Sequence, residues 1–305
     1  MTRRSRALVA VAAVLVTGAA AAPARAGSNG PRDIHPSLRS SVVAYYNFDH
    51  PMPGDPALEA DLGRSGTEIE LVNGGAAMRV QDRAYPGSRN ALKTGPVAAG
   101  TTDDWKAGIW SASGVRTLRA FNAAEGSTVM GFFKRSMDGP AAGFNAIGLT
   151  GVLTGDSDGH AVRALLELID VNGTLRLVAL GRRLDGGNSQ TFAANADWQT
   201  LLPKDQWVHL AATFDFTSGT MALYRDGRPV EGFYTRTDDP WLLNGPGPHV
   251  TTATDPRGIK IGGSFPWQGS PDRNPCDCRM DALMLLDRSL SARDVANQYR
   301  FMTRG

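Results

Sequence analysis

The sequence has 305 residues, 42% of them hydrophobic, with 35 glycines and 18 prolines, which argues against disorder and suits a large fold with many turns. Its formal net charge of +2 at pH 7 changes sign when the first 26 residues are set aside, because these contain four arginines and no acidic residue. The remaining chain is near-neutral with dispersed charge, so nothing in it favours a nucleic acid or an anionic membrane as partner.

The first 26 residues are predicted to be a secretory signal peptide. Arg3, Arg4 and Arg6 form a positive region, residues 7–16 are apolar but short for a membrane span, and residues 24–26 (Ala-Arg-Ala) form a small-x-small cleavage site. Twin-arginine export and an uncleaved membrane anchor are the alternatives. No second long apolar segment follows, so we expect a secreted, extracellular chain without membrane insertion.

The next part of the chain predicts a flexible segment followed by strands. Residues 27–40 are polar, with glycine and proline, and are expected to be flexible. The stretches 101–124 and 235–256 show no sustained period and are expected to be long loops. Apolar and alternating runs predict the main strands, at 41–48, 67–72, 87–94, 127–134, 165–171, 174–180, 207–216, 220–224 and 280–286.

Turn residues connect these strands into hairpins. Asn172-Gly173 is the strongest short hairpin signal, and Asp226-Gly227 supplies a second. Ser291 and Asp294 resemble a capping box that begins a helix over 292–299. Strands joined by hairpins, with one terminal helix and no strand–helix alternation, predict an all-β fold: a two-sheet antiparallel jelly-roll sandwich with a short C-terminal helix.

Several short segments of the sequence carry a family resemblance. They are 207–215 (WVHLAATFD), 223–230 (LYRDGRPV), 280–282 with 287–291, and 44–49 (AYYNFD). This pattern resembles the laminin-G-like domains of the concanavalin A-like lectin/glucanase superfamily and predicts one such domain over 41–305. The resemblance implies a jelly-roll module that often binds without catalysis. Some members hold Ca²⁺, and some relatives are glycosidases or polysaccharide lyases, so the fold alone does not choose among these functions.

The carboxylate pattern argues against the glycosidase option. Retaining glycosidases of this superfamily carry three carboxylates at alternate positions of one strand, so that all face the same side. No such triple occurs here. Glu167 and Asp170 are three apart, and the plain interpretation of such strand carboxylates is a solvated outer face. His209 is expected to be a hydrogen-bonded structural residue rather than a base or ligand.

Calcium is the more serious cofactor hypothesis, because hard cations prefer oxygen ligands. Asp49, Asp61 and Asp281 come from the first strand, the loop after it and the last strand, which lie close together in such a jelly roll. The sequence therefore predicts these three as a possible Ca²⁺ site. The alternative is that Asp281 accepts backbone hydrogen bonds and Asp49 begins a turn. Asp156 to Gly159 is interpreted as an ordinary turn.

The cysteines and the loop tryptophans complete the candidate sites. Cys276 and Cys278 are the only cysteines, and secretion favours a disulfide between them; a redox pair, a soft-metal site and free thiols are the alternatives. Sugar rings stack on exposed aromatic side chains, and the tryptophans in loop-like segments are candidates for this role: Trp105, Trp110, Trp241 and Trp267. The alternative for each is packing beneath its own loop.

These observations favour a secreted, non-catalytic module that binds a carbohydrate or a cell-surface polymer. The alternatives are a secreted polysaccharide-degrading enzyme, with its acid and base on loops, and an adhesion module with a protein partner. A groove lined by tryptophan and polar amides would favour sugar binding, whereas two carboxyl groups about 5–10 Å apart in it would favour hydrolysis.

Overall fold

The structure is a computed structural model. It describes residues 32–66, 68–70, 78–95, 124–153, 162–182, 189–236, 258–262, 274 and 276–304. They belong to one unit that spans residues 31–305. The predicted signal peptide, most of both predicted long loops and the Asp156 turn lie outside the described residues. So do Trp105, Trp110, Trp241 and Trp267, and the roles predicted for them stay predictions.

Strands make up most of the described chain. The elements are η1 (Pro36–Leu38), β1 (Val42–Tyr46), β2 (Pro51–Met52), β3 (Asp55–Glu59), β4 (Ile69–Glu70), β5 (Met78–Gln81), β6 (Asn90–Lys93), β7 (Gly126–Arg135), β8 (Ala146–Leu153), β9 (Val162–Val171), β10 (Thr174–Arg182), β11 (Ser189–Ala194), α2 (Trp198–Leu201), β12 (Val208–Asp215), β13 (Thr220–Arg225), β14 (Arg228–Val230), β15 (Gly232–Tyr234), β16 (Gly258–Ile261), β17 (Cys278–Leu286) and α3 (Ala292–Thr303). Within the described part of the chain, no helix has the length and apolar character that a membrane crossing needs.

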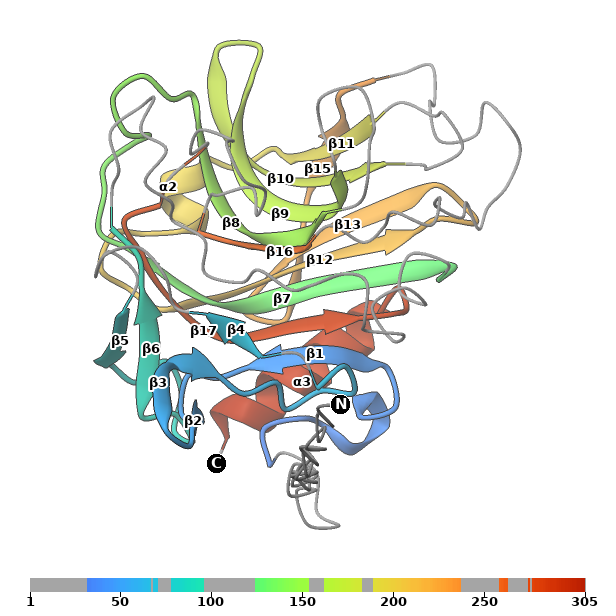
Figure 1. The fold of residues 1–305 in the computed structure, drawn as a ribbon. Helices are drawn as coiled ribbons and strands as arrows, with labels where there is room; N and C mark the ends of the chain where they lie inside the picture. Colours follow the sequence, from blue (N-terminus) through green and yellow to red (C-terminus); the bar gives the residue numbers. More distant parts are fainter. Residues whose placement is uncertain are drawn as a thin grey trace, which may run out of the picture. The chain divides into compact units, whose positions relative to one another are not determined.

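The strands of the described residues form antiparallel sheets of eight, six and three strands. The eight-stranded sheet runs β14-β13-β12-β7-β17-β6-β5, and β1 pairs with the C-terminal part of β17. The six-stranded sheet runs β15-β11-β10-β9-β8-β16, and β2-β3-β4 form the small sheet. The two larger sheets are stacked, and α3 lies against the face of the eight-stranded sheet that points away from the other (Figure 1). The predicted all-β sandwich with a C-terminal helix is confirmed.

Both predicted two-residue turns are present. Asn172 and Gly173 join β9 to β10 with φ of 54° and 82°, and Asp226 and Gly227 join β13 to β14 with φ of 50° and 74°. Positive φ at both central positions matches the right-handed twist of the flanking strands, and Asn, Asp and Gly tolerate this conformation. These turns fix the register of the two hairpins.

The alternation predicted along β12 divides its side chains between two cores. One face contributes Val208, Leu210, Ala212, Phe214 and Phe216 to the main core between the two larger sheets. The other face places Ala211 in a second core beneath α3, which also holds Val295 and Met302 from the helix. Full burial of Phe214 contributes about 1.5–3 kcal/mol to folding.

The C-terminal helix begins as predicted and ends later. Ser291 and Asp294 form both hydrogen bonds of the capping box. The helix continues to Thr303 rather than ending at 299, because Met302 is buried against the outer face of the eight-stranded sheet. The capping prediction is confirmed, and only the end of the helix differs.

The prediction of a flexible segment is wrong for residues 32–40. Ile34 and Leu38 are 2% and 0% exposed and belong to the core beneath α3. The His35 N–H donates to Oε1 of Gln298 at 2.8 Å, and Nε2 of Gln298 donates to the Asp33 carbonyl at 2.7 Å. Two apolar residues within a polar stretch are therefore enough to fix this segment against the C-terminal helix.

Candidate functional site

Asp61, one of the three predicted calcium ligands, organises the loop after β1. Its Oδ1 accepts the N–H groups of Tyr45 and Gly63, both at 2.7 Å. Its Oδ2 accepts the N–H of Gly66 at 2.8 Å and the Ser65 hydroxyl. Burial raises the pKa of Asp61, and these hydrogen bonds lower it. Because both oxygens already accept two hydrogen bonds, Asp61 has a structural role here.

Asp281 lies at a bulge in β17. Its register with β7 shifts between Asp281 and Met284, and Ala282 has a φ of 50° there. Oδ1 of Asp281 accepts the Ala282 N–H at 2.6 Å, whereas Oδ2 is buried without a hydrogen-bond partner. Burial raises the pKa of Asp281 well above its ordinary value; the nearby Ser88 side chain, although it makes no hydrogen bond to Oδ2, and the Ala282 N–H lower it, and the charges of Asp49 and Asp33 raise it again.

The two carboxylates whose charges act on Asp281 already accept hydrogen bonds. Oδ1 of Asp49 accepts the Asn90 N–H at 2.9 Å and its Nδ2 at 2.7 Å, and Oδ2 accepts the Arg89 N–H at 3.2 Å. Oδ2 of Asp33 accepts the hydroxyls of Tyr45 and Tyr85, both at 3.1 Å. Asp33, which the sequence did not point to, is thus a second carboxylate whose charge acts on Asp281.

The three predicted ligands do not fit a Ca²⁺ site as they are arranged. Asp61 is engaged in its own loop, and a single buried oxygen of Asp281 is free. No group of three acidic, histidine or cysteine side chains arranged to hold a metal occurs among the described residues. The backbone-accepting role of Asp281, which was the alternative, is what the structure shows.

The candidate catalytic residues of the strands do not form a site. His209 is 1% exposed and packs against the rings of Phe132 and Tyr299, with centroids at 5.0 and 5.6 Å. Burial lowers its pKa to about 4, and its Nδ1 lacks a hydrogen-bond partner, so the residue is structural but not hydrogen-bonded there. Glu167 is 3% exposed, which corrects the solvated position expected for it, and Asp170 accepts the N–H of Gly173 in the hairpin turn.

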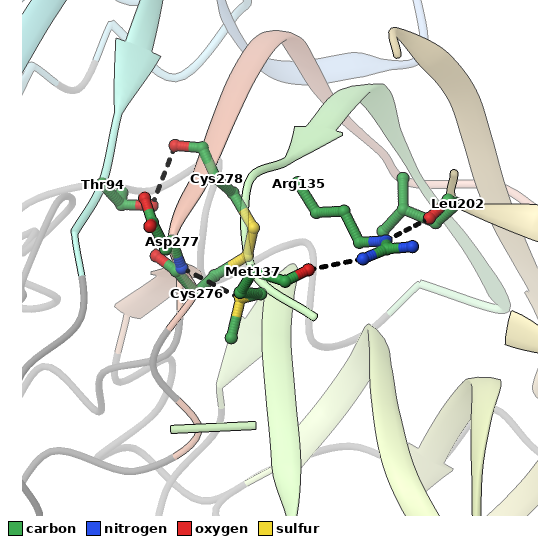
Figure 2. Close-up of a disulfide and its surroundings, with 7 residues drawn as sticks. All are labelled: Thr94, Arg135, Met137, Leu202, Cys276, Asp277 and Cys278. Atoms are coloured by element: carbon green, nitrogen blue, oxygen red, sulfur yellow. Dashed lines mark hydrogen bonds between the residues drawn. A yellow bond between two sulfur atoms is a disulfide. The ribbon is translucent and has the colours of Figure 1, made fainter. Parts of the chain in front are cut away.

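The two cysteines are joined in the structure by a disulfide in the main core (Figure 2). Thr94 holds this loop: its hydroxyl donates to the Cys276 carbonyl at 2.7 Å, and its N–H donates to the Cys278 carbonyl at 2.9 Å. On the other side, the Asp277 N–H donates to the sulfur of Met137 at 3.1 Å. The disulfide therefore lies in a loop that is also held by hydrogen bonds to Thr94 and Met137.

Two arginines, one at the end of β7 and one in the β13–β14 hairpin, contact the C-terminal end of helix α2. Arg135 donates to the carbonyls of Met137 and Leu202, and Figure 2 shows its guanidinium between them. That guanidinium also lies over the ring of Trp198, 4.6 Å from the centroid. From the hairpin, Nε of Arg225 donates to the Leu201 carbonyl at 2.8 Å. Both arginines thus satisfy carbonyls that the C-terminal end of a helix leaves without partners.

A groove with a volume of about 540 Å³ lies between α2 and the β13–β14 hairpin. We call it the edge groove, because it lies where edge strand β14 of the eight-stranded sheet leads through Glu231 into edge strand β15 of the six-stranded sheet. Its lining residues are Asn195, Ala196, Leu201, Arg225, Arg228, Pro229, Val230 and Glu231. The volume is within the range of pockets that bind small ligands.

The polar side chains of the edge groove are largely free to bind. Asn195, Arg228 and Glu231 are exposed, and their side chains make no hydrogen bond or ion pair with the described residues. Leu201, Pro229 and Val230 supply apolar surface beside them. The groove therefore combines an amide, a guanidinium and a carboxylate with an apolar lining, and Glu231 is the only carboxylate among its described lining residues.

The sequence alone does not reveal the edge groove, although one signal for it is present. Arg225 and Arg228 flank the predicted Asp226-Gly227 turn and are direct cross-strand partners. Like charges at such positions repel each other and do not stabilise the hairpin. A pair of arginines beside a two-residue turn is therefore more typical of a binding site than of a structural contact. Asn195 carries no comparable sequence signal, because its place in the groove depends on how the segment that leads into α2 packs.

Comparisons with known proteins agree with this architecture. Residues 148–296 match the laminin-G model of the concanavalin A-like lectin/glucanases superfamily. The structure resembles Trypanosoma rangeli sialidase in complex with sialic acid, with a TM-score of 0.51 at 18% identity, covering 87% of this chain and 33% of the sialidase. It also resembles the binding domain of botulinum neurotoxin DC in complex with rat synaptotagmin II, with a TM-score of 0.53 at 10% identity, covering 87% and 52%.

These structural likenesses concern the fold alone, because the identities are low and the chain spans only a third to a half of the similar proteins. A search of curated protein sequences found no match. The family model, in contrast, matches the sequence of this chain. The matched residues span the strands from β8 to β17 and the start of α3, and they include both hairpins that the sequence predicted. Over residues 148–296, the chain accordingly matches the concanavalin A-like lectin/glucanases superfamily, as its sequence resemblance predicted.

Proposed function

We propose that this chain is a secreted, non-catalytic module that binds a carbohydrate or a cell-surface polymer in the edge groove. The observation that carries the proposal is the set of unengaged polar side chains, Asn195, Arg228 and Glu231, beside an apolar lining. Sugar hydroxyls both donate and accept hydrogen bonds, and the C–H faces of a sugar ring are apolar. An amide, a guanidinium and a carboxylate together offer partners for both roles of a hydroxyl.

The edge strand favours a ligand held by side chains over an added peptide strand. A peptide that extends a sheet relies on backbone hydrogen bonds along the edge. Strand β14 contains only Arg228, Pro229 and Val230, and Pro229 has no N–H to donate. A short edge interrupted by proline is a poor template for strand addition.

The proposal of a non-catalytic module rests on the carboxylates of the edge groove. Glycoside hydrolysis generally needs two carboxyl groups about 5–10 Å apart across the scissile bond. Glu231 alone supplies a carboxylate among the described lining residues, so an acid–base pair would need a second carboxylate from elsewhere. The similarity to a sialidase is the reason to test for product release together with binding.

A polysaccharide panel tests the proposal directly. The secreted form of the chain would be immobilised and scored for retention of neutral and acidic polysaccharides, and the supernatants for new reducing ends or unsaturated products. We expect retention without release, weakened in the Asn195→Ala variant. Release of products would replace the proposal by the enzyme alternative, and retention of none of the polymers would refute it.

Calcium remains a separate proposal within the same panel. The predicted ligands Asp49, Asp61 and Asp281 form no metal-binding group of three among the described residues, so the support for Ca²⁺ is the sequence resemblance alone. Repeating the panel with calcium and with chelator decides this point. Equal retention in both conditions would show that binding does not require Ca²⁺.

A further inference from the structure

The two arginines of the edge groove are placed opposite each other. In the β13–β14 hairpin, Arg225 and Arg228 are register partners on either side of the Asp226-Gly227 turn. Partners of this kind have Cβ atoms about 4.5–5.5 Å apart on one face of the sheet, and like charges there destabilise the pair. Both residues line the groove, so two positive charges lie beside the place where a ligand would bind.

The remaining contacts hold one guanidinium in place and leave the other available. Nε of Arg225 donates to the Leu201 carbonyl at 2.8 Å, and its Nη1 lies 3.5 Å from the Asp226 carboxylate. Asp226 is itself held, because its Oδ1 accepts the His209 N–H at 3.0 Å. Arg228 is exposed, and its side chain has no hydrogen-bond or ion-pair partner among the described residues. One fixed and one unengaged guanidinium therefore face the same groove.

We infer that the edge groove recognises an acidic sugar, whose carboxylate or sulfate lies between Arg225 and Arg228; this inference rests on the proposed function. Guanidinium groups bind such anions through paired N–H donors, and a bound anion would relieve the repulsion between the two arginines. Asp226 offsets part of the charge of Arg225 but is not a register partner of Arg228. The unengaged charge of Arg228 thus makes it the residue that distinguishes acidic from neutral sugars.

The other polar groups of the groove define the rest of the ligand. Glu231 would repel a second acidic group placed beside it, and its carboxylate accepts hydrogen bonds from hydroxyls. Asn195 can donate and accept. The chemistry therefore fits a sugar unit that carries an acidic group together with free hydroxyls.

Three ligands and three variants test the inference. Polygalacturonate supplies carboxylates, its methyl ester removes their charge from the same backbone, and dextran sulfate supplies sulfates. The variants are Arg228→Ala, Arg228→Lys and Arg39→Ala, the last removing an equal charge from an exposed position outside the groove. Retention would be measured as a dissociation constant at fixed salt, alongside the melting temperature of each variant.

We expect polygalacturonate or dextran sulfate to bind, and the esterified polymer to bind at least tenfold more weakly. Arg228→Ala should weaken binding of the acidic ligand about tenfold or more, the loss expected for a hydrogen-bonded charged group, and Arg228→Lys should recover part of it. Arg39→Ala should bind like the unaltered chain. Which acidic polymer binds identifies the anion.

Other results would overturn the inference in distinguishable ways. Equal binding of the acidic and esterified polymers, both weakened by Asn195→Ala but not by Arg228→Ala, would refute the acidic sugar and keep the proposed function. Equal losses in Arg228→Ala and Arg39→Ala would mean a general charge effect and refute the site. Absence of binding to every polymer would refute the proposed function and the inference together.

Discussion

Replacement of Asp281 by Asn tests how the bulge of β17 is held. The residue is 0% exposed, and its Oδ2 has no hydrogen-bond partner. Burial raises its pKa well above the ordinary value, and the nearby charges of Asp49 and Asp33 raise it further. Asn keeps the shape and the oxygen that accepts the Ala282 N–H, but it cannot ionise. The substitution therefore removes the ionisable group and keeps the hydrogen bond to the Ala282 N–H.

The sign of the effect follows from the raised pKa. Below about pH 4, the usual Asp pKa, the carboxyl is protonated in both the folded and the unfolded chain, and the titration contributes nothing. As the pH rises above that value, the unfolded chain loses the proton while the folded chain keeps it, so stability falls. The loss is about 1.4 kcal/mol per pH unit until the folded pKa is reached. Asp281→Asn should therefore become more stable than the unaltered chain as the pH rises.

Denaturant unfolding between pH 4.5 and 8, with calcium and with chelator, measures this difference. The matched control is Asp205→Asn, which changes an exposed carboxylate at a positive φ that Asn also tolerates. We expect the stability difference to grow with pH for Asp281→Asn and to stay near zero for the control. A variant that is less stable at pH 8, with a calcium effect lost on substitution, would show that Asp281 works as an ionised ligand and would refute this reasoning.

Three further predictions concern His209, Gly63 and the ion pair of Arg79 with buried Glu59. Burial lowers the pKa of His209 to about 4, so as the pH falls below its unfolded value of about 6.5 the folded chain should lose stability, and His209→Phe should remove this loss in pH-dependent unfolding. Gly63→Ala should destabilise by about 1–3 kcal/mol or more, because the new Cβ would lie 2.6 Å from a backbone oxygen, whereas Gly139→Ala, with open space, should melt unchanged. Arg79→Ala should lower stability by about 3–5 kcal/mol, because it leaves fully buried Glu59 unpaired, and Glu59→Gln in the same background should recover part of the loss.

Features set by local sequence could be predicted well. The alternation of residues 208–216 places one face in the main core because side chains alternate in any strand. The turns at Asn172-Gly173 and Asp226-Gly227 need positive φ, which few residue types tolerate. The capping box of α3 likewise depends on residues three apart. In each case the physical cause lies within a few residues, so the sequence contains all of it.

Features that depend on distant segments could not be predicted in this way. The edge groove forms where α2 meets a hairpin about 25 residues later in the chain, and Arg225 is fixed there by a carbonyl of Leu201. Asp33 acts on Asp281 because residues 32–40 pack beneath α3, contrary to their polar composition. Asp61 was drawn into the calcium prediction because only its position in the chain, and not its four hydrogen-bond donors, can be seen in the sequence.

The proposed function depends most directly on where a ligand binds. An NMR titration of the isotope-labelled chain, with short oligomers of whichever polysaccharide is retained, measures this without altering the protein. We expect the shifted amide signals to cluster at Asn195, Arg228 and Glu231, with the Arg225 guanidinium signal moving as the acidic group binds. Shifts confined to another surface, with these signals unchanged, would contradict the edge groove as the binding site.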